Sequence, residues 1–62
     1  SRWAVSEILD RVRSNPEVPI ASTVEVFMAE MTYFAHISPE TSAREMFTNA
    51  ADTAADILSM IS

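Results

Sequence analysis

Few side chains in this sequence could do chemistry. The 62 residues include one histidine, His36, and neither cysteine nor glycine. A His–His or cysteine-based metal site is therefore excluded, and a site made of His36 and Glu40 would have to span the break at Ser38–Pro39. Without glycine the chain also lacks a phosphate-binding loop and a nucleophile elbow. We expect no metal, no cofactor and no enzymatic activity.

Three carboxylates point to an interaction rather than to catalysis. Glu45, Asp52 and Asp56 are separated by seven and four residues, which places them on one side of a helix. General acid–base catalysis needs carboxylates held in a concave pocket, whereas a ridge of this kind faces solvent. We call these residues the acidic ridge and consider it a candidate docking site for a basic partner.

The distribution of charge restricts the partners further. The formal net charge is −5: residues 1–13 carry three arginines and two acidic residues, whereas residues 14–62 carry one arginine and seven acidic residues. Nucleic acids and anionic membranes attract basic surfaces, so neither is expected to bind. The sequence has no uninterrupted apolar run of membrane-spanning length and no signal-peptide layout. We expect a cytoplasmic or other intracellular location.

Glu30 is the carboxylate of most interest, because it borders a second apolar surface of one predicted helix. The first surface of this helix, residues 22–37, has the spacing of a core-facing stripe and comprises Val24, Phe27, Met28, Met31, Phe34 and Ala35. The second surface consists of Val26, Tyr33 and Ile37, with Glu30 at its edge. We call these four residues the partner strip.

Two interpretations of the partner strip are open. Another helix of the same chain could cover it, or it could be a contact surface for a partner, with Tyr33 as an amphipathic anchor. If the strip is buried, Glu30 requires a partner such as an arginine of the first helix or of a neighbouring subunit. Trp3 is expected either at the edge of the core or in a hydrophobic staple, or else as a further partner contact.

The remaining elements follow from periodicity and helix-end signals. We expect a first helix at residues 2–13, with an apolar face of Val5, Ile8, Leu9 and Val12. Two prolines end it, and Val18 and Ile20 should then contact the core. Ser22 and Glu25 form a capping box for the helix at residues 22–37. Ser38 and Pro39 predict a third helix at residues 39–60. Its seam is Ala43, Phe47, Ala50, Ala54, Ile57 and Ile61.

These elements predict an all-α, single-domain, three-helix bundle, with a break near Asn49 and a fourth helix as the alternative. The chain begins at Ser1 rather than methionine, so we expect residues 1–62 to be excised from a longer chain. A chain of this size buries only about 60% of its unfolded surface, and oligomerisation is one way to complete such a core.

The function expected from these features is a non-enzymatic protein–protein interaction or oligomerisation module. We expect a homodimer whose contact is centred on the partner strip, with Trp3 as a further contact residue. The alternative is an accessory or regulatory domain of a larger protein, such as a transcription factor or an enzyme. Such a domain would dock on a basic partner through the acidic ridge.

Overall fold

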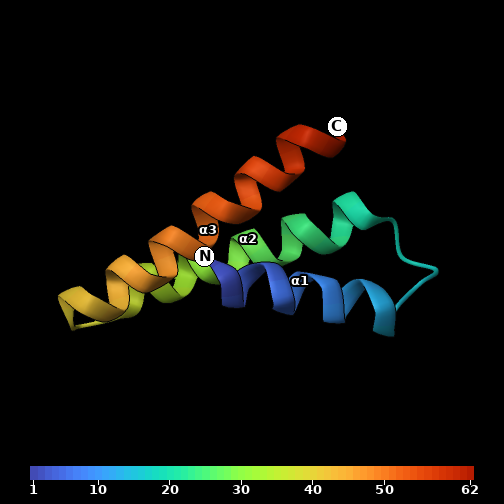
Figure 1. Ribbon diagram of the computed structural model, residues 1–62. Coiled ribbons are helices and arrows are strands. Elements are labelled where there is room, and N and C mark those ends of the chain that lie inside the picture. The colour runs from blue at the N-terminus through green and yellow to red at the C-terminus, as the bar shows by residue number, and fades with distance from the viewer.

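The protein consists of three helices and no strand. The computed structural model describes every residue from Ser1 to Ser62, with α1 at Arg2–Ser14, α2 at Ile20–Ile37 and α3 at Thr41–Ile61. Helix α2 runs antiparallel to both neighbours, so α1 and α3 point in the same direction (Figure 1). The all-α three-helix prediction is confirmed. Because α3 continues through Asn49, the alternative with a fourth helix is wrong.

Helix α2 begins two residues earlier than predicted. Pro19 occupies the N-cap position, no side chain caps the helix, and Ser22 lies inside it. The predicted capping box of Ser22 and Glu25 is therefore wrong. The proline ring restricts φ of Pro19, which is −55°, to a value compatible with entry into a helix. The helix therefore begins directly after Pro19, before the chain reaches Ser22.

The connection from α2 to α3 also differs from the prediction. Ser38 does not cap α3; its hydroxyl donates to the carbonyl oxygen of Phe34 at 2.6 Å, and its N–H bonds the same oxygen at 3.0 Å. Ser38 thus satisfies an otherwise free carbonyl at the end of α2. Helix α3 begins at Thr41 rather than Pro39, with Glu40 at its N-cap. Arg44 then bonds the carbonyl oxygens of Ser38 and Pro39, at 3.1 Å each.

The core lies where the three helices meet. Phe27 and Val24 of α2 are its largest fully buried side chains, and Ala50 and Ala54 of α3 are also fully buried. Small side chains at these two positions of the predicted seam let the helices approach closely. The buried apolar set is Ala4, Ile8, Val24, Phe27, Met31, Ala50 and Ala54.

Helix α1 covers only part of the other two helices. Its N-terminus lies against the middle of α3, where the ammonium group of Ser1 donates to Oγ1 of Thr53 at 2.8 Å. Beyond this point, the end of the molecule where α2 connects to α3 contains only those two helices (Figure 1). At the opposite end, the last turns of α3 rise away from α1 (Figure 1).

Several residues predicted to be buried are therefore exposed. They are Val5 and Leu9 of α1, Val18 and Ile20 around the first connection, Phe34 of α2 and Ile61 of α3. Conversely, the sequence did not indicate that Ala4 and Thr23 are buried. The three helices are too few and too unequal in length to cover every apolar stripe.

Candidate interaction surface

The three apolar residues of the partner strip are not covered by any other helix of the chain. Val26, Tyr33 and Ile37 keep 54%, 60% and 52% of their surface exposed. Helical geometry explains this, because the strip lies about 100° or more from the stripe of Val24 and Met31 that faces the core. Of the two interpretations open from the sequence, cover by a helix of the same chain is therefore wrong.

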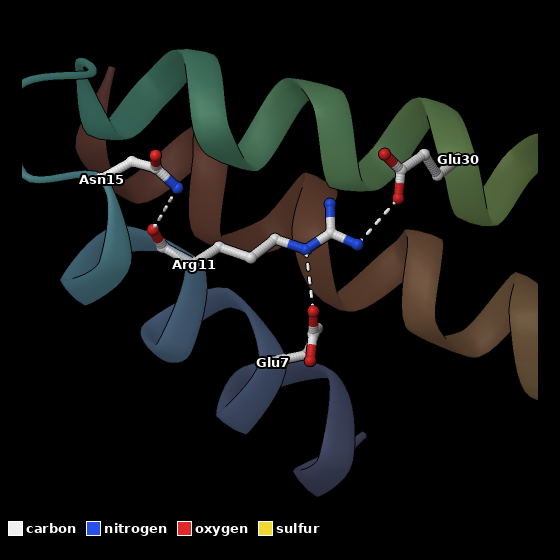
Figure 2. A network of polar contacts seen from close by, with 4 residues as sticks. All are labelled: Glu7, Arg11, Asn15 and Glu30. Carbon is white, nitrogen blue, oxygen red and sulfur yellow. Dashed lines mark hydrogen bonds and ion pairs between the residues drawn. The ribbon is translucent and has the colours of Figure 1, made fainter.

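Glu30 of the partner strip forms an ion pair with helix α1. Its Oε1 accepts a hydrogen bond from Nη2 of Arg11 at 2.8 Å, and Nε of Arg11 donates to Oε2 of Glu7 at 2.9 Å. Figure 2 shows the guanidinium group of Arg11 between the two carboxylates, and the second oxygen of Glu30 forms none of the drawn contacts. Glu30 is thus held by one oxygen, while the other, Oε2, is free.

Arg11 is the residue that joins α1 to α2 electrostatically. Its guanidinium carbon also lies 5.1 Å from the centre of the Phe27 ring, in a cation–π contact. The hydrogen bond to Glu30, followed by that to Glu7, raises the pKa of Arg11 above its usual value. The guanidinium therefore remains charged and holds the Glu30 carboxylate in place.

Trp3 lies at the edge of the core, one of the arrangements expected from the sequence. Its ring meets that of Phe27 edge-on, with centroids 6.3 Å apart, and 43% of the residue remains exposed. Trp3 lies inside α1, which begins at Arg2 with Ser1 as its N-cap, so it does not precede the helix as a staple would. Trp3 and Arg11 both contact Phe27, and Trp3 therefore lies on the side of α1 that faces α2.

Phe34 enlarges the apolar area beside Tyr33, and the sequence did not identify it as a surface residue. The ring centroids of Tyr33 and Phe34 are 5.8 Å apart, and those of Phe34 and Phe47 of α3 are 5.4 Å apart. Phe34 keeps 39% of its surface exposed, although its spacing belongs to the core stripe. No local pattern indicates this exposure, because it depends on how the three helices pack against one another.

A cavity of about 190 Å³ opens beside the other end of the partner strip. Its lining comes from the end of α1, the first connection and the first turns of α2: Arg11, Asn15, Val18, Ser22, Thr23 and Val26. Most of its surface is apolar. Local sequence patterns carry no signal for this cavity, because its walls come from two helices and the loop between them.

The acidic ridge is exposed along the outer side of α3. Glu45, Asp52 and Asp56 face solvent, and both ion pairs of the chain involve Arg11 rather than these residues. His36 is exposed in the last turn of α2. No three His, Cys, Asp or Glu side chains are grouped as metal ligands would be.

Comparisons with models of protein families, with curated proteins and with solved structures found no match. None of the three helices combines the length and apolar character needed to cross a bilayer.

Proposed function

We propose that this protein is a non-enzymatic self-association module, and that the partner strip of α2 forms the contact of a homodimer. The observation that carries this proposal is the exposure of Val26, Tyr33 and Ile37, each more than half accessible in an otherwise folded chain. Apolar side chains grouped on one face are stabilised when another surface excludes water from them. The core of such interfaces is enriched in aromatic residues, the role assigned here to Tyr33.

The size of the chain is consistent with a dimer. A stable interface buries about 800 Å² on each partner, which is about one fifth of the 4214 Å² that the chain exposes. The half-exposed side chains of Trp3 and Phe34 offer further apolar area to such an interface. Association would thus supply part of the burial that a chain of 62 residues cannot achieve alone.

Sedimentation equilibrium over a wide range of protein concentrations tests this proposal. We expect the wild-type protein to form a dimer and the Tyr33→Glu variant to be a folded monomer, because a charge in the interface must lose its hydration. The matched control is Thr32→Glu, which adds the same charge to the neighbouring exposed position on the polar side of α2. It should still dimerise.

Two results would contradict the proposal. If Tyr33→Glu dimerises as well as the wild type, the contact lies on another surface. If the wild-type protein is a folded monomer at every concentration, self-association itself is rejected.

The second candidate function is docking on a basic partner through the acidic ridge. The observation that favours it is that Glu45, Asp52 and Asp56 form no ion pair with an arginine of the chain, so their negative charges remain available to attract a basic partner. This candidate predicts a monomer in isolation, whose binding to a basic protein weakens steeply as salt is added. A monomer in the sedimentation experiment would favour it over the homodimer.

A further inference from the structure

The partner strip is symmetrical about its own centre. Its residues, Val26, Glu30, Tyr33 and Ile37, are separated by steps of four, three and four, which is the heptad spacing of residues that line a helix–helix seam. The outer two positions are aliphatic, and the inner two are a carboxylate and a phenol. A two-fold axis through the centre of this seam therefore places the aliphatic side chains of one copy against those of the other. It also places each carboxylate against a phenol.

We propose that a second copy of this chain docks antiparallel along the partner strip, and that Tyr33 of each copy donates a hydrogen bond to Oε2 of Glu30 of the other. This inference rests on the proposed function and adds the orientation, the register and the polar contact of the dimer. Val26 of each copy then packs against Ile37 of the other.

Charge decides between the two possible orientations. In a parallel pair each position meets its own counterpart, so the two Glu30 carboxylates face each other and repel. In the antiparallel pair each carboxylate meets a phenol O–H, a donor suited to a charged acceptor. Self-complementarity under a two-fold axis is also what a closed dimer requires.

The contacts within one chain prepare Glu30 for this role. Arg11 holds Oε1 of Glu30 at 2.8 Å, and no group of the same chain bonds Oε2. The side chain remains 41% exposed, so a second molecule can reach the free oxygen. The carboxylate is thus already oriented and partly neutralised before the partner arrives, which reduces the cost of burying it.

The cavity beside Val26 fits the same arrangement. In the antiparallel register, Ile37 of the second copy lies opposite Val26, next to the open cavity of about 190 Å³. Ile37 is half exposed at the end of α2 and free to enter it. An aliphatic anchor placed in a largely apolar pocket is a common centre of binding energy.

Cysteine cross-linking tests the register, because the chain contains no cysteine of its own. Val26→Cys and Ile37→Cys variants would each be treated alone, and then as an equimolar mixture, with a short bismaleimide. The mixture should give a cross-linked dimer, whereas each variant alone should give little. Eleven residues of α-helix separate the two positions, so like thiols in the antiparallel dimer are about 16 Å apart.

A double-mutant cycle tests the hydrogen bond itself. Tyr33→Phe retains the ring and removes the donor from both copies, so the loss of two hydrogen bonds should weaken dimerisation about a hundredfold in the wild-type background. In a Glu30→Ala background the same substitution should change the dimer affinity little, because the acceptor is already absent. Analytical ultracentrifugation of the wild type, the two single variants and the double variant measures the dimer affinities, and these give the coupling energy between Tyr33 and Glu30.

The possible failures are distinguishable. Cross-linking of each single variant with itself would show a parallel pair and overturn the proposed register. A wild-type dimer without any cross-linking, or an equal effect of Tyr33→Phe in both backgrounds, would overturn the arrangement and leave self-association standing. A wild-type monomer at all concentrations would reject the proposed function together with this inference.

Discussion

At the scale of single residues, Arg11 connects more of the molecule than any other charged side chain. It bonds Glu7 within α1 and Glu30 of α2, and it lies over the ring of Phe27. Both carboxylates are more than a third exposed, so solvent screens these ion pairs and limits their contribution to stability. The importance of Arg11 therefore lies as much in positioning Glu30 as in stabilising the fold.

The raised pKa of Arg11 determines how its contribution to stability changes with pH. A cation whose pKa is higher in the folded state stabilises that state fully below its unfolded pKa, and the contribution is lost as pH rises through the folded value. For arginine both values lie far above neutrality. The positive charge of Arg11 is thus constant wherever the protein is folded under physiological conditions.

Replacing Arg11 by methionine should lower the free energy of unfolding by about 1 kcal/mol, because methionine retains much of the aliphatic packing and loses the hydrogen bonds. Urea denaturation followed by circular dichroism measures the change. Arg13→Met is the matched control, since Arg13 is exposed in the same last turn and forms no ion pair. Equal losses in both variants would show that the Arg11 contacts do not stabilise the fold.

At the scale of elements, the packing of α2 against α3 depends on small residues. Ala50 and Ala54 are fully buried one turn apart, opposite the large side chains of Phe27 and Val24. This arrangement lets the backbones approach closely, and it leaves no room for a longer side chain. Helix α1 is attached more loosely, with Ala4 and Ile8 as its only buried residues.

Overpacking tests the close approach of α2 and α3. Ala54→Leu should destabilise the protein by about 1–3 kcal/mol, because the added atoms force the helices apart or strain side chains. Ala55→Leu adds the same atoms at the next, exposed position of α3 and should change stability by less than about 0.5 kcal/mol. Thermal and urea unfolding of both variants provide the comparison. If Ala54→Leu behaved like its neighbour, the helices would not be in close contact at that position.

At the scale of the whole molecule, the dominant feature is incomplete burial. The protein measures 36 × 21 × 18 Å, and eight of its 62 residues are buried. Large apolar side chains are exposed on all three helices, up to 77% for Met60 near the end of α3. A fold of this kind has little stability of its own to spare, so association can contribute a substantial part of it.

This coupling predicts that thermal stability depends on protein concentration. If the folded chain dimerises and the unfolded chain does not, mass action should raise the Tm by a few degrees for each tenfold increase in concentration. Differential scanning calorimetry over two decades of concentration measures the slope. The Tm of Tyr33→Glu should show no such dependence. A wild-type Tm that is independent of concentration would contradict a dimer that stabilises the fold.

The three helices, the two breaks between them and the seam of α3 are features that could be predicted from the amino-acid sequence alone. These features are local, because helical periodicity, prolines and side-chain volume act over a few neighbouring residues. The sequence also distinguishes the partner strip of α2 from its core stripe, because successive residues of a helix are rotated by about 100° and the two sets therefore point in different directions. Helix starts were less predictable: the capping signals of Ser22 and Ser38 were overridden by the geometry of Pro19 and by a bond from Ser38 back to Phe34.

Which apolar stripes are covered depends instead on how the three helices pack together. Ser1, the N-cap of α1, lies beside Thr53, 52 residues away in the chain, and with α1 packed in this way Phe27 is buried whereas Phe34 and Tyr33 remain exposed. Likewise, the pairing of Arg11 with Glu30 and the cavity beside Val26 arise from how two helices lie against each other. Periodicity fixes the direction of a side chain around its own helix, but burial depends on what the rest of the chain places in front of it.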